Sequence, residues 1–186
     1  MNMKELQDTL QKLIPALNKI GLRYHITGGL AVSYHGEPRL TQDIDIVLEA
    51  NDAPKFALET YQQLSTEFYL EQVAVFEAFK NQKMFQILDE TTLVKTDLHV
   101  GENIPNELSR TCLIEILPGI KVPMVSHEDA IISKLIWVKN GSQKSWQDLS
   151  MLLSRTNILN LELIQKLVLE LNLTAEWNTA QTKTKS

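Results

Sequence analysis

The sequence predicts an α+β fold, in which a mixed sheet flanked by helices is followed by a region of helices alone. Strand-like and helix-like segments alternate up to residue 125, whereas no strand-like segment follows it. The composition is that of an ordinary soluble globular chain, with 186 residues, 44% of them apolar, and a net charge of -5. We therefore expect a core over 1–125, a C-terminal helical region over 126–173 and a flexible tail over 174–186.

The first elements expected are a helix, a strand and a second, short helix. Apolar residues recur three and four positions apart over 6–20, and a glycine follows where a helix would end. Residues 23–27 are typical of a short strand, which runs straight into Gly28 and Gly29. A short helix is expected after the glycine pair, ending at Gly36.

The middle of the chain continues as mixed α and β. A loop containing Pro38 leads to a strand over 43–49. The next segment is typical of a helix over 52–64, with Asp52 as a capping residue and Pro54 in the first turn. Four further strands are expected as two pairs with a turn inside each, at 83–89, 92–100, 112–117 and 120–125.

Helices alone are expected after residue 125. Ser126 followed by Asp129 predicts a capping box at the start of a helix that continues to Asn140. Two more helices are expected over 145–154 and 161–172. The residues after them are polar, which predicts a frayed end.

Composition also narrows the class of protein. Cys112 is the only cysteine, and the four histidines lack the paired spacing of a zinc site, so we expect a reducing, cytoplasmic location. The charged N-terminus is unlike a signal peptide, and no apolar run approaches the ~20 residues that span a bilayer. The acidic net charge argues against a protein that coats long nucleic acid non-specifically.

The stretch DIDIVL places two carboxylates in a predicted strand. Because successive side chains of a strand alternate between its faces, Asp43 and Asp45 share one face, roughly 6 to 7 Å apart, while the isoleucines face the core. Two anions this close repel each other unless a cation lies between them or one takes up a proton. Mg²⁺, or Mn²⁺ in its place, is the simplest cation for such oxygen ligands.

Two further features fit a site for nucleotide chemistry. Asp97 is an acidic residue in the otherwise apolar strand predicted over 92–100. If that strand neighbours the first, three carboxylates meet at one end of the sheet, as is common in metal-assisted phosphoryl and nucleotidyl transfer. The pair Gly28-Gly29, between a strand and a helix, lets backbone N–H groups approach a phosphate closely.

Together these residues resemble a known superfamily. The pattern of an apolar residue, two glycines, a spacer, Asp-apolar-Asp-apolar and a later strand Asp is similar to the DNA polymerase β type nucleotidyltransferases. Residues 25–48 and 125–152 resemble small bacterial nucleotidyltransferases related to the AbiE-type toxin, and the likeness covers about 23–153.

The resemblance implies a role for each residue of the motif. Gly28 and Gly29 would touch the triphosphate of a bound nucleotide, ATP among the candidates. Asp43 and Asp45 would hold magnesium, and Asp97 would complete the site and activate the acceptor hydroxyl. In one respect the sequence departs from the family pattern, because Lys144, Ser145 and Trp146 precede Asp148 where members often carry an arginine.

Several other residues have a functional and a structural interpretation. Arg39 and Lys134 are candidate nucleotide contacts, with solvated surface side chains as the alternative. His25, His35 and His99 are expected to be structural. Trp137, Trp146 and the leucine-rich C-terminal helices are expected to be core or packing-face elements, with a groove for a partner protein as the alternative.

The expected function is transfer of a nucleoside monophosphate from a nucleoside triphosphate to an acceptor hydroxyl, with release of pyrophosphate. The alternative is a non-catalytic binding module, or a toxin–antitoxin component that acts through its helical surface. A metal-dependent nuclease is disfavoured because the glycine pair would have no task in it. An RNA end, a protein hydroxyl and a small hydroxylated compound all remain open as acceptors, and no residue indicates the preferred base.

Overall fold

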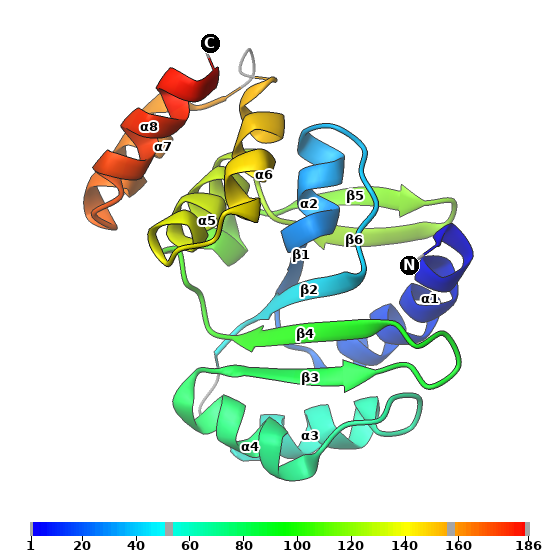
Figure 1. Cartoon of the computed structure of the whole chain (residues 1–186). Helices are drawn as coiled ribbons and strands as arrows, with labels where there is room; N and C mark the ends of the chain where they lie inside the picture. The colour runs from blue at the N-terminus through cyan, green and yellow to red at the C-terminus, as the bar shows by residue number, and fades with distance from the viewer. Residues whose placement is uncertain (1, 51–53, 156–158, 185–186) are drawn as a thin grey trace.

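The computed structural model describes residues 2–50, 54–155 and 159–184, and these form one six-stranded sheet with helices packed around it (Figure 1). The strands are β1 (Tyr24–Thr27), β2 (Asp43–Leu48), β3 (Met84–Leu88), β4 (Lys95–Val100), β5 (Cys112–Leu117) and β6 (Ile120–Met124). The helices are α1 (Met3–Ile20), α2 (Gly28–His35), α3 (Pro54–Leu64), α4 (Gln72–Asn81), α5 (His127–Lys139), α6 (Lys144–Leu153), α7 (Leu161–Glu170) and α8 (Thr174–Thr184), with a 3-10 turn, η1, at Glu107–Ser109.

The sheet is mixed, which confirms the predicted fold class. Its strand order is β3-β4-β2-β1-β6-β5. The pairs β2–β4 and β1–β6 are parallel, whereas β1–β2, β3–β4 and β5–β6 are antiparallel. β1 and β2 therefore lie at the centre of the sheet, where both of their edges are hydrogen bonded.

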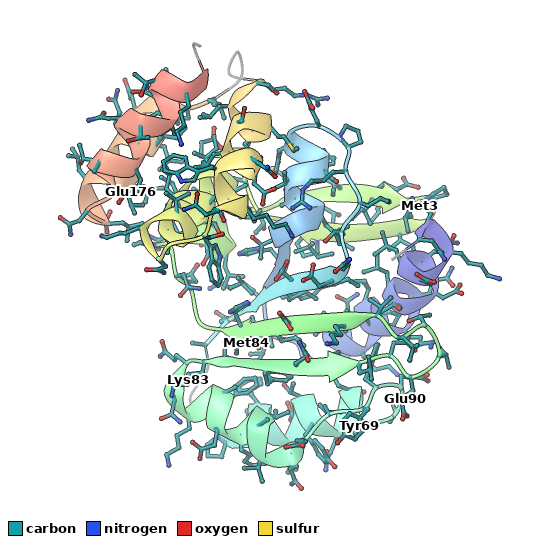
Figure 2. All side chains as sticks on the ribbon, viewed as in Figure 1. Met3, Tyr69, Lys83, Met84, Glu90 and Glu176 are labelled. Atoms are coloured by element: carbon teal, nitrogen blue, oxygen red, sulfur yellow. The ribbon has the colours of Figure 1, made fainter. Side chains whose placement is uncertain are left out.

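Helices cover the sheet in two groups. α1 and α3 pack together, α3 contacts α4, and these helices contact β6, β3 and β4. α2 contacts β1 and β2 and also packs against α5 and α6 (Figure 1). α7 and α8 pack against the outer side of α5 and α6. Glu176 on α8 and Met3 on α1 lie at opposite sides of the molecule (Figure 2). None of the described helices combines the length and hydropathy that a membrane crossing requires.

The helix boundaries follow the predicted signals closely. α1 begins with Asn2, whose side chain accepts from the backbone of Lys4 and Glu5 in a complete capping box, and ends at Gly21 with φ 76°. α5 begins as predicted, since the Ser126 hydroxyl accepts from the backbone N–H of Asp129. The carboxylate of Asp129 accepts the Ser126 hydroxyl proton in return. The capping role expected for Asp52 lies outside the described residues.

Two helices are not predicted by the sequence patterns. α4 buries Val75, Ala78 and Phe79 in a stretch for which no element is expected. Where a flexible tail is expected over 174–186, the structure instead has α8, with Trp177 and Ala180 buried. Widely spaced apolar residues suffice to hold an otherwise polar helix when a neighbouring helix covers them. The predicted division of the chain at residue 125 coincides with the last strand, and its status as a domain boundary stays a prediction.

A buried carboxylate ties α1 to the β3–β4 hairpin. Asp89 is fully buried, and its oxygens accept from Lys12 at 2.9 and 3.0 Å and from the hydroxyls of Thr9 and Thr91 at 3.1 and 2.7 Å. Burial alone would raise the pKa of Asp89, but the hydrogen bonds from Thr91, Lys12 and Thr9 outweigh it and hold this pKa well below its ordinary value. Asp89 is therefore charged in the native state at neutral pH.

We predict that Asp89→Ala lowers the free energy of unfolding by roughly 2–4 kcal/mol, because it leaves the partners of a buried carboxylate unpaired. A native pKa below the unfolded value of ~3.9 stabilises the fold above that pH, and this contribution is lost as the pH falls through the native pKa. The deficit in denaturant melts should therefore be large at pH 7 and shrink below about pH 4. Glu90→Ala, at the exposed neighbouring position in Figure 2, is the matched control; equal losses in the two variants would contradict the anchoring role.

Candidate active site

One pocket of about 480 Å³ opens between the start of α2, the strand β2 and the helices α5 and α6. Six of the residues that line it were predicted as site residues, and a seventh, Asp148, comes from α6. The six predicted residues are Gly28, Gly29, Arg39, Asp43, Asp45 and Lys134. The pocket therefore collects groups from segments more than a hundred residues apart in the chain.

The strand pairing brings the three predicted carboxylates to one region of the sheet. β2 and β4 are adjacent and parallel, and Asp45 is the register partner of Asp97. Asp43 accepts a hydrogen bond from the Thr41 hydroxyl at 3.0 Å. Asp97 accepts from Gln86 Nε2 at 2.7 Å, and it does not belong to the described residues that line the pocket. The predicted neighbourhood of the two strands is thus confirmed.

Asp45 lies in an environment that disfavours its charge. Burial raises its pKa above the ordinary value, and the charges of Asp43 and Asp97 raise it further. Lys134 and His99 act in the opposite direction but do not reverse the shift. Among the described residues, no three acidic, histidine or cysteine side chains are arranged as a ready-made metal cluster. The assignment of Asp43, Asp45 and Asp97 as metal ligands stays a prediction.

The glycine pair makes room for the carboxylates. Gly28 has φ 62°, a left-handed conformation that residues with a side chain adopt at a cost. A Cβ built at Gly28 would overlap the carboxylate of Asp45, and one at Gly29 would overlap the hydroxyl of Thr41. Both glycines lie in the first turn of α2. A side chain at either position would displace Asp45 or Thr41.

A buried aspartate, which sequence analysis did not select, holds the two basic candidates. Asp148 on α6 has a side chain only 4% exposed, and it lies 3.0 Å from Arg39 Nη2 and 3.0 Å from Lys134 Nζ. The side chains of Arg39 and Lys134 are 18% and 12% exposed, so the alternative of solvated surface residues is wrong for both. The sequence signal that could have identified Asp148 is its position next to Leu149, because both residues lie on the buried face of α6, where a charged residue is unusual.

The aromatic residues and histidines divide into two groups. Trp137 lines the pocket and is 51% exposed, so the expected core or packing-face position is wrong for this residue. Trp146 is partly buried and packs against the core as expected. His25 is fully buried, and His35 Nε2 lies 2.7 Å from the carbonyl oxygen of Val125, which agrees with structural roles. His99 differs from these two because it lines the pocket.

Comparison with protein families identifies the chain. A family model described as the nucleotidyl transferase AbiEii toxin of a type IV toxin–antitoxin system matches residues 19–180. The chain belongs to the AbiEii family. Both the predicted superfamily and the predicted nucleotidyltransferase class are thereby confirmed. The match extends through the helical region to α8, well beyond the motif of glycines and aspartates. No curated protein sequence matches this AbiEii-family chain significantly.

Solved structures support the same fold. The antibiotic-resistance factor ANT(2'')-Ia is 13% identical, with a TM-score of 0.63 over 96% of this chain and 100% of its own. An antigenic nucleotidyltransferase-like protein from Paracoccidioides brasiliensis is 20% identical, with a TM-score of 0.56 over 83% of this chain and 76% of its own. A candidate nucleotidyltransferase from Thermotoga maritima is 16% identical, with a TM-score of 0.54 over 79% of this chain and 93% of its own.

The geometry around the glycine pair gives a prediction with a matched control. Gly28 and Gly119 both have positive φ, at 62° and 78°, but only a Cβ at Gly28 meets other atoms within 4 Å. Gly119→Ala should therefore cost only the backbone strain, roughly 1–2 kcal/mol. Gly28→Ala should cost distinctly more in denaturant melts, because it also displaces Asp45. Equal costs would show that Gly28 serves the turn alone.

Proposed function

We propose that this AbiEii-family chain transfers a nucleoside monophosphate from a nucleoside triphosphate to an acceptor hydroxyl. One observation carries the proposal. A glycine turn, a carboxylate pair on β2 and two partly buried cations face a single pocket, and they come from separate elements. Phosphate groups, a divalent cation and a reacting hydroxyl require these three kinds of group.

The phosphates are held by the side of the pocket formed by α2 and α5. Backbone N–H groups at Gly28 and Gly29, in the first turn of α2, approach the triphosphate without side chains in the way. Arg39 and Lys134 offset its negative charge. Asp148 keeps these two cations in place, because its carboxylate bonds both of them at about the same distance. Asp148 is in this sense a positioning residue.

The donor set fits a hard divalent cation. Asp43 and Asp45 line the pocket, and the raised pKa of Asp45 reflects burial and repulsion from Asp43 and Asp97 that a cation would relieve. We assign Mg²⁺ or Mn²⁺ to these carboxylates, with Asp97 completing the set. When bound, the metal supplies charge that stabilises the transferring phosphoryl group.

Asp97 is the residue that we assign to deprotonation of the acceptor hydroxyl. The acceptor oxygen forms a bond to the α-phosphorus while the bond to the bridging oxygen breaks, and pyrophosphate leaves. Asp97 takes the proton from the acceptor hydroxyl. The hydrogen bond from Gln86 fixes one oxygen of Asp97 and leaves the other to receive that proton. An RNA end, a protein hydroxyl and a small hydroxylated compound are the acceptor classes to screen.

The family description also motivates a biological role. It names a toxin of a type IV toxin–antitoxin system, and we extend this to the present chain as a cytoplasmic toxin with an antitoxin encoded alongside it. A nucleotidyltransferase and a toxin are compatible, since modification of a cellular acceptor would be the toxic event. The competing idea of a non-catalytic binding module makes no use of the carboxylates that repel each other in the pocket.

Purified protein with magnesium and labelled nucleoside triphosphates should label one acceptor in total RNA, cell lysate or a panel of small hydroxyl compounds. Asp43→Ala and Asp45→Ala should each reduce labelling by at least 100-fold, the order that loss of metal-assisted charge stabilisation implies. Expression of the wild type, but not of these variants, should slow growth. Asp8→Ala, on α1 outside the pocket, should retain full labelling. Labelling that survives in both pocket variants would refute the site.

Thermal melts test whether the carboxylates bind a metal together. Magnesium at a hundredfold excess over its Kd adds ~2.7 kcal/mol to stability, which for a chain of this size is roughly 5–10 °C in Tm. In chelator at pH 7, Asp45→Asn should melt above the wild type, because it removes a charge whose native pKa is raised. That gain should vanish below about pH 4, where the carboxyl is protonated in both states.

The variant should also lose most of the magnesium-dependent rise in Tm. Asp8→Asn makes the same chemical change outside the pocket, and it should leave both the melting temperature in chelator and the magnesium effect unchanged. If wild type and Asp45→Asn shift equally with magnesium, Asp45 is no metal ligand.

A further inference from the structure

The pocket has two chemically different ends. The same face of β2 carries Asp43, then Asp45 and then Val47, so the wall changes from acidic to apolar along the strand. Beyond Asp43 and Asp45, the acidic residues of the described lining are Asp148, which contacts Arg39 and Lys134, and Glu107, which is buried and hydrogen bonded. The lining also includes the following side chains: Val47, His99, Asn103, Ile104, Trp137 and Asn140.

Trp137 is the most conspicuous side chain at this second end. It lies three residues after Lys134 on α5, about 4.5 Å further along the helix axis and on a neighbouring part of the same face. Half of its surface is exposed although it lines a concave pocket. An indole placed in this way offers an open aromatic face one helical turn from a cation that we assign to phosphate binding.

Hydrogen bonds fix another part of the pocket wall, the loop after β4. In the loop after β4, the buried carboxylate of Glu107 accepts from the backbone N–H groups of Asn103 and Ile104 at 2.8 and 3.2 Å. Arg110 donates to the carbonyl oxygen of Pro105 at 2.8 Å. These bonds hold the backbone that carries Asn103 and Ile104 in the pocket wall, so this end of the pocket is formed before any ligand binds.

We propose that this second end of the pocket binds the nucleobase of the nucleoside triphosphate, with the base stacked on Trp137 and its edge turned towards the amides of Asn103 and Asn140. The inference rests on the proposed nucleotidyl transfer and adds the subsite for the base. Stacking on an aromatic ring binds any base, because every base has a π face. Neither amide has a side-chain hydrogen-bond partner in the part of the chain that the structure describes, and each offers donors and an acceptor.

The occupant is the base of the donor nucleotide rather than a ring of the acceptor. Lys134 and Trp137 lie on one face of one helix, so a molecule whose phosphates bind Lys134 extends along α5 past the indole. Asp97, to which we assign the acceptor proton, lies on β4 and is not among the described residues of the pocket wall. The acceptor therefore approaches from the side of the sheet, and α5 is left to the nucleotide.

Calorimetry with two probes tests the subsite. The probes are the four nucleoside triphosphates and ribose 5-triphosphate, which keeps the sugar and phosphates but lacks the base, each with magnesium and no acceptor. Wild type should bind at least one nucleoside triphosphate more tightly than ribose 5-triphosphate. Trp137→Ala should weaken that nucleotide by roughly 5- to 150-fold, the range found when stacking aromatics are replaced by alanine. Its affinity for ribose 5-triphosphate should stay unchanged.

The controls separate the subsite from the proposed function. Trp137→Phe keeps an aromatic face and should retain most of the affinity. Tyr69→Ala removes a similarly exposed ring outside the pocket and should change nothing. If the wild type binds both probes equally, or if Trp137→Ala weakens neither or both alike, the base subsite is overturned while nucleotide binding stands. If the wild type binds no nucleoside triphosphate, the proposed function fails together with the subsite.

Discussion

The register between β2 and β4 is the constraint on which the site depends. Ile44 and Ile46 are fully buried on one face of β2, as is Leu98 on β4, and this apolar face fixes how the two strands pair. A slip of one residue would turn Asp45 into the core and expose the isoleucines. Packing on the apolar side of the sheet thus holds the carboxylates of Asp45 and Asp97 in register on the opposite side, although their charges repel.

The other wall of the pocket carries positive charge, from Arg39 and Lys134. Arg39 and Lys134 would repel each other if left alone, but both contact Asp148, which is almost completely buried. Removing one partner of such a buried group leaves the others uncompensated, so the three form one unit. The pocket therefore has an acidic wall, where Asp43 and Asp45 repel each other, and a basic wall, where one carboxylate contacts two cations. Under the proposed function, the metal that accompanies the nucleotide would relieve the repulsion on the acidic wall.

The sequence allowed the six strands and most of the polar residues named in the pocket to be predicted. Strand alternation and the glycine pair are local signals; they placed β1 and β2 correctly and selected Gly28, Gly29, Asp43 and Asp45, which the structure brings to one pocket. Asp148 and Trp137 could not be assigned in this way, because their roles depend on which helix face meets the pocket. Asp148 is a charged residue on a buried helix face, and Trp137 is an aromatic residue on an exposed one. Both depart from the usual pattern of apolar residues inside and polar residues outside, and both line the pocket.

The helical region is consequently part of the site and no appendage to it. Lys134 and Asp148 belong to α5 and α6, and Arg39 belongs to the loop before β2, so the salt bridges at Asp148 join the two regions predicted on either side of residue 125. α2, which begins with the glycine pair, packs against both of these helices. Any shift of α5 and α6 relative to the sheet would move Lys134 and Asp148 away from Asp43 and Asp45. Packing between α2 and the C-terminal helices thus sets the width of the pocket, and α7 and α8 support that packing from outside.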